Sequence, residues 1–74
     1  MDLIELYQQL VDHFGSQQAT ALSLGCKQPS VNAWVAGKSK MSAVVATRAE
    51  ISTNGQYKAA DLCPDLKTAL AKSA

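Results

Sequence analysis

The chain has few of the residues that stabilise small proteins by means other than regular packing. Its 74 residues include two cysteines, two prolines, one tryptophan, two tyrosines and one phenylalanine. Cys26 and Cys63 have no second cysteine pair, which excludes a disulfide scaffold and the usual pattern of a structural zinc site. A chain of this length forms one domain and buries only about 60% of its unfolded surface. It therefore needs regular helices, and a partner subunit would add to its stability.

Long apolar runs and an excess of one charge are also missing. No stretch of about 18 apolar residues occurs, so no membrane span is expected. The first residues are acidic and amphipathic, unlike a signal peptide, so we expect a cytoplasmic protein in which both cysteines are free thiols. The formal net charge is +1, which by itself indicates no partner.

The sequence also lacks the components of an active site. Its single histidine, His13, has only Asp12 beside it, and adjacent residues on a helix point apart. No set of nucleophile, base and orienting residue can be assembled, and no glycine-rich phosphate loop is present. We therefore expect no enzyme activity, catalytic residue, cofactor or metal.

The charges that are present are unevenly distributed. Residues 1–12 carry three acids and no base, whereas residues 13–49 carry Lys27, Lys38, Lys40 and Arg48 and no acid, a local charge of +4. From residue 50 onward, three acids and three lysines cancel. This basic surplus indicates a surface for nucleic acid, and chance clustering of four charges is the alternative.

Apolar periodicity predicts an all-α fold of about five helices. A first helix over Asp2–His13 has an apolar face, and Ser42 caps a fourth helix over Ala43–Ser52. Pro64 permits only a short helical turn before it, and Asp65–Lys72 has the pattern of a further helix. We assign residues 1–66 to one domain and residues 67–74 to a C-terminal tail, partly helical or frayed.

Between the first and fourth helices lies a predicted helix-turn-helix. Its helices are Gln17–Leu24 and Gln28–Ala36, and Gly25 suits the left-handed end of the first of them. The buried residues should be Ala19, Ala21 and Leu22 in one helix and Val31, Trp34 and Val35 in the other. A lone tryptophan at helical spacing is more often core than a base-stacking platform, so we assign Trp34 to the core.

Two motifs resemble known families. Gln17, Ala21, Gly25 and Val31, with Trp34 following, resemble the helix-turn-helix of phage Cro and repressor proteins. Further on, AVVATRAEISTNGQYKAADLCPDL resembles YdaS-type Cro-like regulators through Glu50, Thr53, Gly55 and the D-L-x-P-D-L ending. The sequence departs from the family pattern at Thr20, where an aliphatic residue is usual, at Lys27, where a capping Ser or Thr is common, and at Cys63, often an arginine.

The resemblance implies a lambda-repressor-like domain that reads DNA through its second motif helix. Gln and Asn can each pair with N6 and N7 of adenine, and family members contact bases from the places of Gln28 and Asn32. Pro29 and Ala33 could add apolar contacts, for example to a thymine methyl. Without the motif, Gln28 and Asn32 would read as solvated helix residues.

A second group of residues is expected to contact the DNA backbone. Helix N-termini bind phosphate through free N–H groups, and lysines add affinity without sequence preference. Arg48 has two open interpretations, a phosphate contact or a pair with an internal carboxylate. The expected backbone contacts are Ser16, Gln17, Gln18, Lys27, Ser30, Lys38, Ser39 and Lys40.

The sequence therefore predicts a Cro-like transcriptional repressor of phage or prophage origin. It would bind double-stranded operator DNA on the nucleoid in the bacterial cytoplasm, as a homodimer at least when bound. The alternative is an antitoxin-like protein-interaction module with a toxin partner and secondary DNA binding. The segment Leu62–Ala71 distinguishes the two, because an exposed apolar strip there favours a protein partner.

Overall fold

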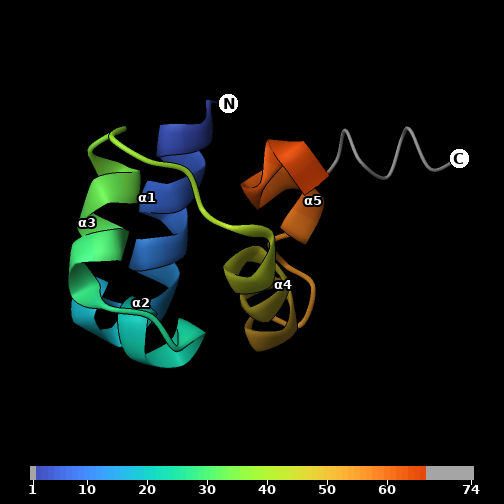
Figure 1. The fold of residues 1–74 in the computed structure, drawn as a ribbon. Helices are drawn as coiled ribbons and strands as arrows, with labels where there is room; N and C mark the ends of the chain where they lie inside the picture. The colour runs from blue at the N-terminus through green and yellow to red at the C-terminus, as the bar shows by residue number, and fades with distance from the viewer. Residues whose placement is uncertain (1, 67–74) are drawn as a thin grey trace, which may run out of the picture.

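The computed structural model describes residues 2–66 and has five α-helices in that range (Figure 1). No β-strand occurs within it, which confirms the predicted all-α class. The predicted C-terminal tail, and most of the helix expected over Asp65–Lys72, lie outside the described residues. The helices are α1 (Leu3–Phe14), α2 (Gln17–Leu24), α3 (Gln28–Val35), α4 (Ala43–Ser52) and α5 (Ala59–Leu62).

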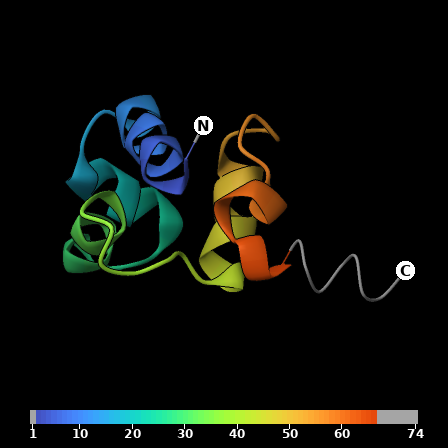
Figure 2. The same cartoon turned by 90° about the horizontal axis from the view of Figure 1, so that it is seen from above.

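The helices form two groups. Helices α1, α2 and α3 pack together, and the segment 36–42 leads from them to α4 and α5 (Figures 1 and 2). Helix α2 contacts α4, and α1 contacts α5, so the second group packs against both ends of the first. Within the helix-turn-helix, α2 packs against both α1 and α4.

Side chains at the helix starts explain why the boundaries follow the sequence. Ser16 and Ser42 accept hydrogen bonds from the N–H groups of Ala19 at 3.0 Å and Val45 at 3.3 Å. Each bond satisfies an N–H that has no partner within the helix. The predicted bounds of α2 and α4 are confirmed, and α3 ends at Val35 with Ala36 as its cap.

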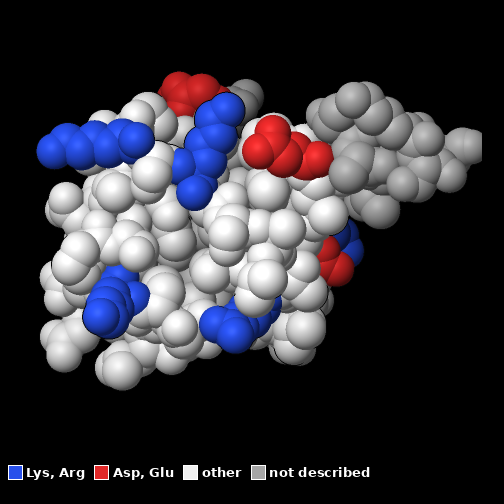
Figure 3. Space-filling view, viewed as in Figure 1, with Lys and Arg blue, Asp and Glu red and all other residues white. Residues whose placement is uncertain are grey.

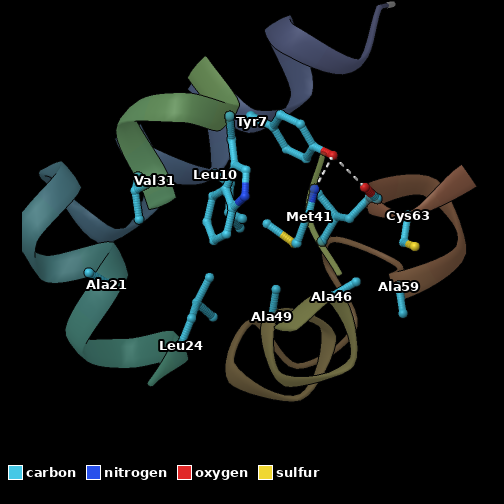
Figure 4. Packing of buried hydrophobic residues seen from close by; sticks show 12 residues of the cluster. Tyr7, Leu10, Ala21, Leu24, Val31, Met41, Ala46, Ala49, Ala59 and Cys63 are labelled. Carbon is cyan, nitrogen blue, oxygen red and sulfur yellow. Dashed lines mark hydrogen bonds between the residues drawn. The ribbon is translucent and has the colours of Figure 1, made fainter. Parts of the chain in front are cut away.

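The core lies where the two groups of helices meet (Figure 4). Trp34 is only 4% exposed, which confirms its assignment to the core. The predicted inward face of α2 was partly wrong, because Leu22 is 77% exposed while Thr20 and Leu24 are buried. Thr20 fits inside because its hydroxyl donates to the carbonyl of Ser16 at 2.7 Å. The buried apolar residues are Tyr7, Leu10, Ala21, Leu24, Val31, Trp34, Met41, Ala46, Ala49, Ala59, Leu62 and Cys63.

Tyr7 connects three parts of the chain. Its hydroxyl donates to the carbonyl of Leu62 at 2.8 Å and accepts from the N–H of Met41 at 3.0 Å (Figure 4). Burial raises the pKa of this hydroxyl above its ordinary value, and the hydrogen bond from Met41 offsets part of that rise. The apolar periodicity of the first helix does not indicate this bridge.

The acidic and threonine residues of the C-terminal motif have structural roles. The Glu50 carboxylate accepts from the N–H of Ala59 at 2.7 Å, at the start of α5. The Thr53 hydroxyl donates to the carbonyl of Ala49 at 2.8 Å and accepts from the N–H of Tyr57 at 3.2 Å. These bonds close the turn between α4 and α5, which explains why the motif has its spacing.

Candidate nucleic-acid interface

The turn between α2 and α3 is tight and internally bonded. Gly25 has φ 68°, in the left-handed region, and the N–H of Cys26 donates to the carbonyl of Ala21 at 3.0 Å. Lys27 occupies the N-cap of α3 and makes no capping bond with its side chain. The N-terminus of α3 therefore lacks the side-chain cap that a Ser or Thr would supply at this position.

Arg48 reaches across from α4 to this turn. One guanidinium N–H donates to the carbonyl of Leu24 at 3.2 Å, at the C-terminal end of α2. This partner is neither of the two expected from the sequence, since it is a backbone carbonyl rather than a phosphate or a carboxylate. A cation at a helix C-terminus is favourable, so Arg48 stabilises the contact between α4 and the helix-turn-helix.

Four of the candidate residues are brought together on one surface. Gln17 of α2 and Gln28, Pro29 and Asn32 of α3 line an open pocket of about 420 Å³. The Asn32 side-chain amide donates to the Gln17 carbonyl oxygen at 3.5 Å, across the helix-turn-helix. Gln28, Pro29 and Asn32 are exposed, and their chemistry matches that of base edges in the major groove.

Other candidates on α3 differ in exposure. Ala33 is half-buried, and its carbonyl accepts from the N–H of Lys38 at 2.9 Å, so the loop that follows α3 lies close to it. Ser30 is exposed. Ala36, also exposed, follows Asn32 by four residues and shares its side of the helix. The same spacing rule applied to the sequence would have added Ala36 to the candidates.

The N-terminal end of α2 adds polar groups beside the pocket. Ser16 accepts from the N–H of Ala19 with its side chain, while Gln18 is exposed. The first N–H groups of a helix lack partners within the helix and favour an anion. Ser16, Gln17 and Gln18 thus lie at a helix end that favours an anion.

Basic side chains lie at both ends of α3. Lys27 precedes the helix, and Lys38 and Lys40 follow it in the loop, all three exposed. The N–H groups of Lys38 and Ser39 both donate to the carbonyl of Ala33, which fixes this loop to the helix end. Figure 3 shows basic side chains above and below an uncharged surface, with the acidic side chains nearer the upper and right-hand edges.

Metal-binding clusters and membrane-spanning helices are both absent from the described part of the chain. Residues 2–66 contain no cluster of histidine, cysteine, aspartate or glutamate that could hold a metal ion. In the same range no helix has the length and apolarity needed to cross a membrane. Cys26 and Cys63 are both free thiols, as expected.

Comparisons with known proteins agree with this arrangement. A family described as bacterial toxin YdaS matches residues 7–70. A curated relative, the regulatory protein Cro of Pseudomonas phage D3, is 52% identical over 59 residues, which cover 80% of this chain and 81% of the relative. No solved structure matches. Both matches include α2, the turn and α3.

Proposed function

The chain belongs to the YdaS family of Cro-like regulators, and we propose that it is a sequence-specific repressor that binds double-stranded operator DNA. Its α3 helix would enter the major groove. The observation that carries the proposal is the open pocket of Gln17, Gln28, Pro29 and Asn32. An exposed pair of side-chain amides at the start of a recognition helix is suited to adenine.

The chemistry of each side chain determines which part of the DNA it would contact. Gln28 and Asn32 would read base edges, with Pro29 and Ala33 in apolar contact beside them. No arginine or lysine occurs in α3 (Gln28–Val35), so the guanidinium or ammonium contact to guanine is missing from this helix. We therefore expect adenine at the positions that the two amides read.

The remaining candidates would hold the DNA backbone. Lys27, Lys38 and Lys40 would contact phosphates on either side of the groove and make the affinity dependent on salt. Ser16, Gln17 and Gln18 at the start of α2, with Ser30 and Ser39, would donate hydrogen bonds to the same backbone. Two copies would place their α3 helices in successive major grooves, about 34 Å apart.

A protein-binding role is the second candidate, because the matching family is described as a toxin. The segment that would favour it is Leu62–Ala71. Leu62 is fully buried against α1, and Leu66 packs partly against the core, so residues 62–66, the described part of this segment, offer no exposed apolar strip. Leu70 lies outside the described residues. This favours the repressor over the toxin-partner alternative.

Selection from random duplex DNA tests the proposal. Purified protein should enrich a two-fold consensus with adenine at discrete positions of each half. Absence of any enrichment at low salt would contradict DNA reading and favour the protein-binding role.

A further inference from the structure

The turn that follows α4 contains an Asn-Gly pair, Asn54 and Gly55, in a left-handed conformation. Asn54 is exposed and has φ 54°, and within residues 2–66 it is the one residue other than glycine with a positive φ. Gly55 follows with φ 81°. Asparagine and glycine adopt this region more readily than other residues, so the pair suits the place where α4 ends.

An Asn-Gly pair can modify itself. The backbone nitrogen of the glycine attacks the side-chain carbonyl carbon of the asparagine and forms a C–N bond, while the side-chain nitrogen leaves with the displaced proton as ammonia. Water then opens the five-membered imide at one of its two carbonyl groups, which leaves either aspartate or isoaspartate. Glycine favours the attack because no Cβ crowds the attacking nitrogen. In the net reaction water is consumed, ammonia is released and an amide becomes a carboxylate.

The folded turn holds the attacking nitrogen in a hydrogen bond. The N–H of Gly55 donates to the carbonyl of Glu50 at 2.8 Å, and the N–H of Asn54 donates to the carbonyl of Ile51 at 3.1 Å. Thr53 is buried, and its hydroxyl bonds to backbone groups on both sides of it. The nitrogen of Gly55 becomes free to lose its proton and to approach the Asn54 side chain only when these bonds open.

We infer that Asn54 is a deamidation site that the folded turn between α4 and α5 protects. The reaction proceeds from states in which the turn is open, so its rate depends on how often the turn opens. Asn32 is the other asparagine of the chain, and it precedes Ala33 within α3. It lacks both the glycine and the turn, which makes it an internal reference for the reaction.

The two products have different effects on the fold. Aspartate at position 54 places a negative charge at the C-terminal end of α4, which the helix dipole disfavours. The ammonium group of Lys58 lies 3.2 Å from where a Cβ on Gly55 would be, and it offsets this charge. Isoaspartate instead adds a carbon atom to the main chain between Glu50 and Ala59, whose 2.7 Å bond holds the start of α5. A chain that forms isoaspartate while open therefore does not regain the native contact between α4 and α5.

Mass spectrometry of the ageing protein is the main test. The wild type would be kept at mildly alkaline pH, folded in buffer or unfolded in urea, and the peptides that contain Asn54 and Asn32 would be followed. In urea Asn54 should react about tenfold faster than Asn32 or more, because only Asn54 precedes glycine. In buffer Asn54 should react at least about tenfold more slowly than in urea. Equal rates at the two asparagines in urea, or equal rates at Asn54 in buffer and urea, would overturn the inference.

A pair of threonine variants tests the role of the turn. Thr53→Ala removes the buried hydroxyl and should raise the rate at Asn54 in the folded protein by about tenfold. Thr47→Ala removes an exposed hydroxyl that bonds back to Ala43 within α4, and it should leave the rate unchanged. An unchanged rate in folded Thr53→Ala would contradict the protection by the turn. If Thr53→Ala does not fold, the wild type in buffer and urea decides alone.

The stability of the products tests the proposed consequence. Asn54→Asp reproduces the aspartate product and should unfold at about the same urea concentration as the wild type. Protein with isoaspartate at position 54, separated by chromatography, should unfold at a lower urea concentration. An isoaspartate form as stable as the wild type would overturn the claim that the reaction separates α5 from α4. None of these measurements involves DNA, so they stand apart from the proposed function.

Discussion

The side-chain amide of Asn32 lies 3.5 Å from the carbonyl oxygen of Gln17, to which it donates a hydrogen bond. The two residues are 15 positions apart in the chain and belong to different helices of the helix-turn-helix. An amide N–H₂ has a second donor and its own carbonyl oxygen, so Asn32 retains both groups that an adenine requires. The bond thus limits the orientations of Asn32 without using up its ability to read a base.

Gln28→Ala should weaken binding to the selected operator by roughly 1–3 kcal/mol and relax base choice at one position of each half-site. The reason is the loss of a paired donor and acceptor at a base edge. Selection repeated with the variant measures this directly. Gln8→Ala, an exposed glutamine of α1, is the matched control and should change nothing. An unaltered consensus with Gln28→Ala would remove Gln28 from the base contacts.

Lys38→Ala should weaken binding to all sequences alike. A phosphate contact contributes counterion release, so the slope of log affinity against log salt should fall by about one. Titrations at several salt concentrations, on specific and random duplexes, give both quantities. Lys58→Ala, an exposed lysine at the start of α5, is the control. A change in base preference with Lys38→Ala would contradict the phosphate assignment.

Tyr7→Phe should lower the free energy of unfolding by roughly 1–3 kcal/mol at neutral pH. The variant leaves the Leu62 carbonyl and the Met41 N–H without their partner in the core. Urea unfolding measures the loss. An equal stability of variant and wild type would show that water replaces the hydroxyl.

Tyr7→Phe should also change how the stability of the domain depends on pH. Burial raises the pKa of Tyr7 above 10.0, so the folded state holds the phenolic proton more tightly than the unfolded state. The resulting stabilisation of the folded state is complete below the pKa that Tyr7 has in the unfolded chain. It is lost as the pH rises through the higher pKa that Tyr7 has in the folded state. The stability difference between wild type and Tyr7→Phe should therefore shrink at alkaline pH. A difference that stays constant through this range would contradict the assigned shift.

Gly25→Ala should destabilise the domain by about 1–2 kcal/mol, because φ 68° is a left-handed conformation that disfavours a side chain. A Cβ there would also lie 3.0 Å from a guanidinium nitrogen of Arg48. The Arg48→Ala background separates the two effects, since it removes the contacting nitrogen and leaves the backbone conformation of Gly25 as the remaining cost. Thermal unfolding should show a smaller loss for Gly25→Ala in that background than in the wild type. Equal losses in the two backgrounds would mean that Arg48 moves aside without cost.

The helix boundaries could be predicted because they depend on local chemistry. Ser16 and Ser42 cap the next N–H groups along the chain, and Gly25 ends α2 by its backbone conformation. The inward side of α2 depends on its neighbours, which is why Leu22 was placed wrongly. Tertiary packing selected Thr20 instead, with its hydroxyl bonded back to Ser16.

Part of the candidate site could also be predicted, because it depends on local spacing along one helix. Gln28 and Asn32 are one helical turn apart, so spacing alone puts them on one side of α3. The approach of Gln17 to Asn32, and of Arg48 to Leu24, depends on how separate helices cross. Met41 lies in a segment with no periodic pattern, so nothing in the sequence indicated that it is buried. Contacts between separate helices could not be predicted from the sequence.

The bridge made by Tyr7 also affects when the domain can fold during its synthesis. Its two partners, Met41 and Leu62, leave the ribosome long after α1 has emerged. A nascent chain that ends before Leu62 already contains α2 and α3, yet it lacks the carbonyl that receives the buried hydroxyl and the helix that covers α1. The buried hydroxyl of Tyr7 therefore has both of its partners only after the segment through Leu62 has been synthesised.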